Sequence, residues 1–202
     1  MRRGVSAFVS VMAVLLLAAS PAGADGGVSG AHSNIVQVSN SDPGVPVVRT
    51  ASAVANNEGG NVTDTNLAFA RSFSCTGCRT VAVAVQVVVV DGTPSNYQPQ
   101  NAAIAVNDNC QSCQTLAYAH QYVIQTSDET NFGEIVGSSQ LWNIQSQISQ
   151  VANSGEDFVT MSSQLDQLSS EFYHAVVQAV QNQSNGDGGH QAGEDRQLQE
   201  QD

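Results

Sequence analysis

A stretch of 25 residues occurs twice in this chain, and this repeat is the feature that most restricts the fold. Residues 66–90 and 101–125 align without a gap at an offset of 35, with ten identities in 25 positions. Most of the identities fall on alternate residues. Because successive side chains of a strand point to opposite faces, a period of two indicates β-structure.

Each copy predicts a strand, a C-x-x-C turn and a second strand. In the second strand of the first copy, one face carries Thr80, Ala82, Ala84, Gln86 and Val88, and the other carries alternate valines. Both faces are largely apolar, so both need cover. With the turn-rich segment 91–100 as a loop, residues 66–126 predict an antiparallel β-meander whose two C-x-x-C turns lie at one end.

The repeat is flanked by weaker strand signals and by a helical pattern. Residues 25–65 hold strand candidates at 34–38 and 46–55, followed by a polar loop at 56–64. In residues 138–182 the apolar period changes to that of an amphipathic helix. The members of the two apolar series are Leu141, Ile144, Ile148 and Val151, and then Phe158, Met161, Leu165, Leu168 and Phe172.

The helical pattern predicts a hairpin. Asn153-Ser154-Gly155 is a turn signal, in which Asn153 or Ser154 is suited to cap the second helix. We expect Trp142 to pack inside the hairpin. The predicted fold class is therefore α+β, an antiparallel meander with a two-helix hairpin packed on one face.

The two ends of the chain have distinct compositions. Residues 1–24 read as a signal peptide, with Arg2 and Arg3, an apolar run and the small-residue cleavage site Ala22-Gly23-Ala24. Cleavage would leave 178 of 202 residues and, with two of the six arginines removed, shift the formal charge from −12 to −14. Residues 183–202 are rich in Gly, Gln, Asp and Glu, and this composition predicts a disordered acidic tail.

The net charge and the predicted signal peptide together limit which partners the protein can bind and where it is located. A strongly acidic chain without lysine argues against nucleic acid and anionic membrane surfaces as partners. No stretch after residue 24 is apolar enough for a transmembrane helix. We therefore expect a secreted protein, extracellular or associated with the cell wall.

The cysteines Cys75, Cys78, Cys110 and Cys113 allow four interpretations: local disulfides, cross-repeat disulfides, a zinc site or a thiol-redox centre. Export favours disulfides. Local pairs Cys75–Cys78 and Cys110–Cys113 need only two-residue hairpin loops, which would hold the Cα atoms about 4.5 to 5.5 Å apart.

The other interpretations of the cysteines meet specific obstacles. Two C-x-x-C pairs suit a four-thiolate zinc site, but turns of a meander lie roughly 10 Å apart, so the sheet end would have to curl. Redox motifs open a helix, which lowers the thiol pKa, whereas both motifs here precede strands. The local disulfides are the favoured prediction, and no cofactor is expected unless the alternative, zinc, applies.

No catalytic constellation is visible in the sequence. The chain contains neither H-E-x-x-H nor G-x-S-x-G. Its four histidines are scattered: we expect His32 and His190 in flexible ends, and His120 and His174 as hydrogen-bonded residues of apolar faces. We name no catalytic residue and expect a protein without enzymatic activity.

The duplicated motifs resemble an uncharacterised family of exported actinobacterial proteins. The resemblance rests on Asn66-x-Ala-x-Ala70, on Cys75-Thr-Gly-Cys78 with its following valine-rich strand, on Cys110-Gln-Ser-Cys113 and on the pattern at 165–168, and it covers about residues 60–180. It implies export and no particular activity.

The leading hypothesis is a non-catalytic secreted or cell-surface protein, stabilised by disulfides, that acts by interaction or assembly. An uncovered Ala/Thr/Gln/Val face would favour self-association. The alternative is a zinc-binding or thiol-redox protein that uses the four cysteines. A third possibility is an inhibitor or carrier for a co-secreted enzyme.

Overall fold

The structure is a computed structural model that describes residues 32–127, 129–186 and 198–201. Its strands are β1 (Ser33–Asn40), β2 (Pro46–Val62), β3 (Thr65–Phe73), β4 (Arg79–Tyr97), β5 (Gln100–Asp108), β6 (Gln114–Thr126) and β7 (Leu198–Gln201). Its helices are α1 (Phe132–Val136), α2 (Ser139–Ala152) and α3 (Phe158–Gly186). The predicted signal peptide at 1–24 lies outside the described residues.

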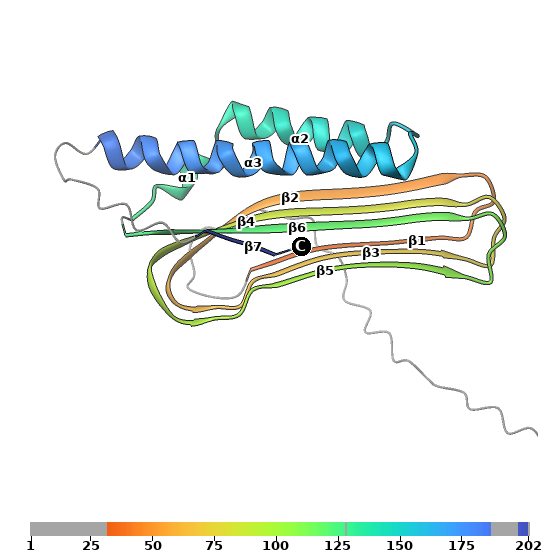
Figure 1. Ribbon diagram of the computed structural model, residues 1–202, viewed down its shortest axis with the longest axis horizontal. Helices are drawn as coiled ribbons and strands as arrows, with labels where there is room; N and C mark the ends of the chain where they lie inside the picture. The colour runs from red at the N-terminus through yellow and green to blue at the C-terminus, as the bar shows by residue number, and fades with distance from the viewer. Residues whose placement is uncertain (1–31, 128, 187–197, 202) are drawn as a thin grey trace, which may run out of the picture.

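The repeat forms parallel sheets, so the predicted antiparallel meander is wrong. One sheet has the strand order β1-β3-β5 and the other β2-β4-β6-β7, and among these described strands only the β6–β7 pairing is antiparallel. The chain alternates between the sheets: each short strand is followed, after a turn, by a long strand in the other sheet (Figure 1). The described strands β1–β6 thus form three stacked coils.

Equivalent residues of successive coils lie directly beside one another. Asn66 pairs with Asn101 and Ala82 with Ala117, which is the offset of 35 seen in the sequence. The first coil, β1 and β2, is a further copy in which Asn34 pairs with Asn66 and Val47 with Thr80. The repeat was therefore undercounted, because residues 25–65 were predicted only as weak strands.

Two apolar layers hold the coils together. Between the sheets, small residues such as Ala68, Ala70, Ala82 and Ala84 are fully buried. The alternate valines at 81–89 face outward from the long strands and pack against α2 and α3. Burial of these side chains is the main source of stability for such a layered fold. Both faces of β4 are covered, as its composition predicts.

The helical hairpin is present and covers only the β2-β4-β6 sheet (Figure 1). The second helix of the hairpin, α3, is capped by Asp157 rather than by Asn153 or Ser154. Asp157 accepts hydrogen bonds from the backbone N–H groups of Val159 and Thr160. Trp142 is 72% exposed, so its predicted packing inside the hairpin is wrong. Among the described helices, none has the length and apolarity needed to cross a membrane.

Three segments that were predicted as loops or as a disordered tail are partly strand or helix in the structure. Most of 56–64 belongs to β2 and most of 91–100 to β4, which continue past their glycines through bulges and bends. The tail predicted from 183 begins inside α3, and 198–201 form β7. Residues 187–197 lie outside the described part.

Candidate functional site

The two C-x-x-C motifs form the turns between the sheets in the second and third coils. Cys75 is disulfide-bonded to Cys78 with Cα atoms 6.2 Å apart, and Cys110 to Cys113 with Cα atoms 5.8 Å apart. Both separations suit a disulfide, which supports the prediction of a local bond in each copy. The turns are not hairpin loops, because the strands on their two sides belong to different sheets.

The backbone of one turn positions the next. Gly77 and Ser112 have φ values of +67° and +55° at equivalent positions, and glycine adopts this conformation without a Cβ clash. The N–H of Gly77 donates to the carbonyl of Gln111 at 2.9 Å, and the N–H of Gln111 donates to the carbonyl of Cys75 at 3.1 Å. Stacked turns therefore bring their cysteines into register.

Three of the four cysteine sulfur atoms form one cluster, and the fourth, that of Cys78, is bonded to Cys75. Cys75 Sγ lies 3.3 Å from Cys110 Sγ and 3.5 Å from Cys113 Sγ, and these three sulfurs all lie within 4.8 Å of one another. Cys75 and Cys78 are buried, whereas Cys110 and Cys113 are half-buried. The expected separation of roughly 10 Å was wrong, because the two turns belong to neighbouring coils. Neither motif begins a described helix.

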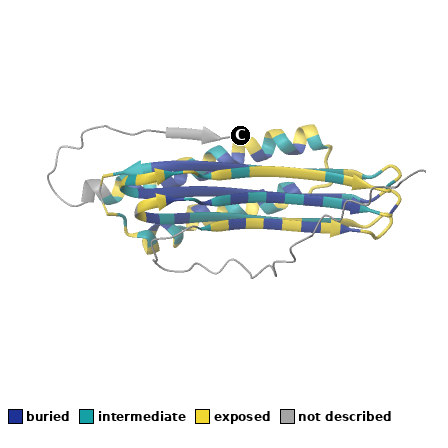
Figure 2. Ribbon diagram, turned by 90° about the horizontal axis from the view of Figure 1, so that it is seen from below, coloured by how far each residue is buried: buried dark blue, intermediate teal, exposed yellow. Residues whose placement is uncertain are grey.

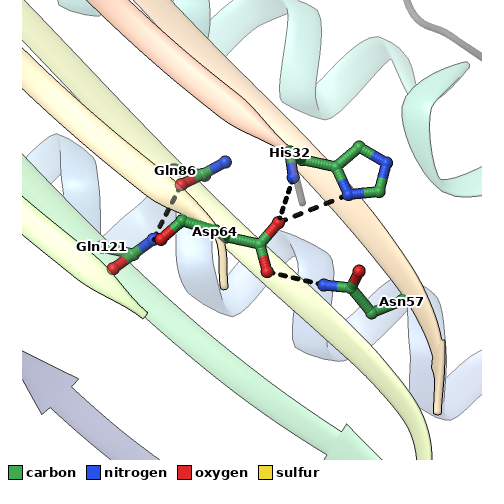
Figure 3. Close-up of polar contacts among 5 residues, drawn as sticks. All are labelled: His32, Asn57, Asp64, Gln86 and Gln121. Atoms are coloured by element: carbon green, nitrogen blue, oxygen red, sulfur yellow. Dashed lines mark hydrogen bonds and ion pairs between the residues drawn. The ribbon is translucent and has the colours of Figure 1, made fainter. Parts of the chain in front are cut away.

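A buried carboxylate lies where the first coil passes into the second (Figure 3). Asp64 is fully buried and accepts hydrogen bonds from the backbone N–H of His32 at 2.9 Å and from Asn57 Nδ2 at 2.6 Å. His32 Nδ1 lies 3.3 Å from the same carboxylate. His32 was expected in a flexible end, but Asp64 holds it, and sequence reasoning did not identify Asp64 at all.

Polar side chains also form ladders along the stack. Asn34 Nδ2 donates to Asn66 Oδ1, and Asn66 Nδ2 donates to Asn101 Oδ1, both at 2.8 Å. Gln121 Nε2 donates to Gln86 Oε1 at 2.8 Å (Figure 3). The identities Asn66/Asn101 and Gln86/Gln121 were visible in the sequence, but their role as ladders was not inferred.

Aromatic rings form a row between β6 and the helices. The rings of His120 and Tyr122 stack at 4.3 Å, and those of Tyr122 and Tyr173 at 4.7 Å. Tyr118 Oη donates to Asp166 at 2.9 Å. Burial raises the pKa of Tyr118, and the nearby Asp166 raises it further, so the phenol stays neutral and remains a hydrogen-bond donor. This row attaches α3 to the sheet.

The described histidines sit on separate elements. His32 precedes β1, His120 lies in β6 and His174 in α3, and His120 and His174 both have aromatic neighbours. His190 lies outside the described residues. The metal-ligating types that come together among the described residues are the cysteines Cys75, Cys110 and Cys113.

The two ends of the stack differ in how well the interior is covered. In β1 the inward-facing residues are buried, whereas β5 is exposed over most of its length, including its inward-facing Ala103 and Ala105 (Figure 2). At the β1–β2 end, Arg49 occupies the inward-facing position held by Ala82 and Ala117 in the other coils. At the other end, β7 pairs with Gln121–Ile124 of β6.

Comparison of the chain with protein-family models, with curated proteins and with solved structures finds no match. The functional assignment therefore rests on the sequence and on the geometry above.

Proposed function

We propose that this chain is an exported, non-catalytic protein that acts by interaction or assembly through the ends of its coil. The observation that supports this proposal most strongly is that β5, the edge strand of a parallel sheet, is exposed along most of its nine residues. An edge strand presents backbone N–H and C=O groups that can pair with another chain. Among the described elements, the helices pack on the β2-β4-β6 sheet and do not cover β5 (Figure 1).

The composition of the edge supports this proposal. Proteins that must stay apart place lysine, proline or inward-pointing charges on their edge strands. The chain has no lysine, and β5 carries a single charged residue, Asp108, at its last position. The Ala/Thr/Gln/Val face expected to favour self-association is instead the interior between the sheets, which moves the candidate surface to the ends of the stack.

Export is supported by the leader-like residues 1–24 and by the two disulfides, which are typical of oxidising compartments. A direct test expresses the full chain in an exporting bacterium and collects the protein from the medium. N-terminal sequencing should then begin at Asp25. Light scattering and chemical cross-linking should show self-association or a defined complex. Intracellular retention, or a monomer without any cross-linked partner, would contradict the proposal.

The sulfur cluster favours a second candidate function, a zinc-binding or thiol-redox protein. Thiolates around a tetrahedral zinc ion lie roughly 3.8 Å apart, given Zn–S bonds of about 2.3 Å. The 3.5 Å between Cys75 Sγ and Cys113 Sγ is close to that value. The residues that would hold the ion are Cys75, Cys78, Cys110 and Cys113 after both disulfides are reduced to four thiols.

Metal analysis distinguishes this candidate. The protein would be reduced with a phosphine, supplied with zinc, desalted and assayed for bound metal and free thiols. One zinc per chain, lost in a Cys110→Ser/Cys113→Ser chain, would support a zinc site. Retention of two disulfides in the exported protein, with no zinc bound after reduction, would leave the cysteines as structural bonds only.

A further inference from the structure

We propose that the two disulfides act as a relay, in which the outer disulfide, Cys110–Cys113, passes electrons from a small dithiol to the inner disulfide, Cys75–Cys78. This inference rests on the thiol-redox candidate of the proposed function and specifies its reaction, its co-reactant and the order of the two bonds. Three observations carry it: the burial of the inner bond, the contact between the two bonds, and the backbone that joins the two turns.

The two disulfides differ in their access to solvent. Cys75 and Cys78 are 6% and 1% exposed, whereas Cys110 and Cys113 are half-buried. A thiolate must reach the sulfur atom that it attacks, so exchange with an external thiol depends on access. A dithiol from solution should therefore react first with the outer disulfide.

Cys75 Sγ is the atom at which the two disulfides meet. It lies 3.3 Å from Cys110 Sγ and 3.5 Å from Cys113 Sγ, so either outer sulfur is in contact with the inner bond. These three sulfur atoms all lie within 4.8 Å of one another, and Cys78 is not a member of this group. Cys75 is therefore the sulfur that a reduced outer cysteine attacks, and Cys78 is the leaving group.

Backbone hydrogen bonds join the two turns independently of the disulfides. The N–H of Gln111 donates to the carbonyl of Cys75 at 3.1 Å, and the N–H of Gln114 donates to the carbonyl of Cys78 at 2.8 Å. These bonds involve no sulfur, so they persist when a disulfide is reduced. A thiolate formed at the outer turn is thereby held beside the inner bond, and such positioning strongly accelerates a reaction. Neither motif begins a described helix, so proximity takes the place of activation by a helix N-terminus.

The relay consists of one reduction and two exchanges. The dithiol transfers two electrons and two protons to Cys110–Cys113 and leaves as a cyclic disulfide. In the first exchange, Cys110 loses its proton and attacks Cys75 Sγ, and Cys78 leaves with the electron pair and takes up a proton. In the second exchange, Cys113 loses its proton and attacks Cys110 Sγ, and Cys75 leaves as a thiolate that is protonated. The outer disulfide is restored, the inner one is reduced, and neither exchange needs a further oxidant or reductant.

The test follows each disulfide of the exported, oxidised full chain during reduction by dithiothreitol. Samples are quenched with acid, free thiols are alkylated, and mass spectrometry of peptides assigns the bonds. In Cys110→Ser/Cys113→Ser, reduction of Cys75–Cys78 should be at least about tenfold slower than in wild type, because the relay is lost. If the outer turn only shields the inner bond, the same variant should react as fast as wild type or faster, and the relay is overturned.

The matched variant, Cys75→Ser/Cys78→Ser, removes the inner disulfide instead. Its outer disulfide should be reduced at the wild-type rate, because the dithiol reaches that bond directly. The relay thus predicts an asymmetry: the inner bond depends on the outer one, and the outer bond does not depend on the inner one. A comparable slowing in both variants would contradict the relay, because the order of the bonds would then have no effect.

A measurement on wild type makes the test independent of any folding defect in the variants. One molar equivalent of dithiothreitol per chain should give, after the acid quench, chains with a Cys75–Cys110 bond and chains in which only the inner disulfide is reduced. If only the outer disulfide is found reduced, the relay is wrong, but the thiol-redox candidate still stands. If neither disulfide of the folded chain reacts with dithiothreitol, both fail together.

Discussion

Asn66 Nδ2 donates a hydrogen bond to Asn101 Oδ1 at 2.8 Å, and the two residues hold the same position in consecutive coils. The same amide nitrogen lies 3.1 Å from the carbonyl oxygens of Ala84 and His120 in the opposite sheet. One side chain therefore links successive coils and also joins the two sheets. A fully buried amide with this many partners is expected to contribute strongly to stability.

Replacing Asn66 by alanine should destabilise the fold by about 3 kcal/mol, because the substitution leaves buried carbonyls and the amide of Asn34 without their partner. The matched variant is Asn101→Ala, at the half-buried end of the ladder, where water can replace the lost bonds and a loss of about 1 kcal/mol is expected. Urea denaturation measures both. Equal losses would show that the ladder is not the reason for the effect.

Replacing Asp64 alone should destabilise the fold, whereas swapping the residues at positions 57 and 64 should largely preserve its stability. Asp64→Asn would place an amide NH2 group opposite the NH2 of Asn57, or opposite the N–H of His32, and should cost about 2 kcal/mol. In the swapped chain Asn57→Asp/Asp64→Asn, the carboxylate introduced at position 57 accepts from the amide introduced at position 64. The amide oxygen at position 64 still accepts from the backbone N–H of His32.

The swap is measured as a double-mutant cycle by chemical denaturation. The swapped chain should recover at least half of the stability lost in Asp64→Asn alone. If the two substitutions destabilise additively, the 2.6 Å bond between these side chains contributes little, and the buried carboxylate is held mainly by the backbone of His32.

The repeat predicted strands correctly but not their partners, for a physical reason. A period of two shows that a segment is extended with two distinct faces, and an antiparallel hairpin or a parallel stack satisfies it equally. What distinguishes the stack is the type of residue that repeats. The identical residues of the two copies, apart from the cysteines, face the interior between the sheets. There each lies beside the same residue of the next coil, as Asn66 lies beside Asn101 and Gln86 beside Gln121.

The first coil and the full length of the long strands could not be recognised from the sequence, because local residue patterns pointed to other structures. The first coil has no cysteines, its turn is one residue shorter, and the register shifts by two further residues at the bulges on either side of Gly60. It therefore does not align with the second coil at the offset of 35. Gly60 and Gly92 indicated loops, although at φ values of +75° and +79° they allow long strands to bend. The helical hairpin was predictable because its apolar period is long and regular. Asp64 carried no motif, since its role depends on the stacking itself.

Loss of either disulfide should lower stability by a modest amount. Each bond closes a loop of about four residues, for which the chain-entropy account gives about 2 kcal/mol. Cys75→Ala/Cys78→Ala should cost more than Cys110→Ala/Cys113→Ala, because the first pair is buried and the second half-buried. Urea denaturation of both variants, with mass spectrometry to confirm the remaining bond, measures the difference. The reverse order would show that the outermost turn stabilises the stack more than the middle one.

The cap of α3 should make part of the stability dependent on acid. Asp157 accepts hydrogen bonds from the N–H of Thr160 at 3.0 Å and from the Thr160 hydroxyl at 2.7 Å, and these bonds lower the pKa of its carboxyl below the ordinary 3.8. Because the folded pKa is the lower one, the stabilisation is complete above the ordinary value and is lost as pH falls through the folded pKa. Asp157→Ala should therefore reduce the melting temperature at neutral pH, and this reduction should shrink as the pH falls below the ordinary pKa of 3.8. Asp157→Asn keeps a capping oxygen without the charge, so it should melt close to wild type at neutral pH and lack this acid-dependent loss. A melting difference between wild type and Asp157→Ala that persists unchanged at low pH would show that the charge of the cap is not responsible.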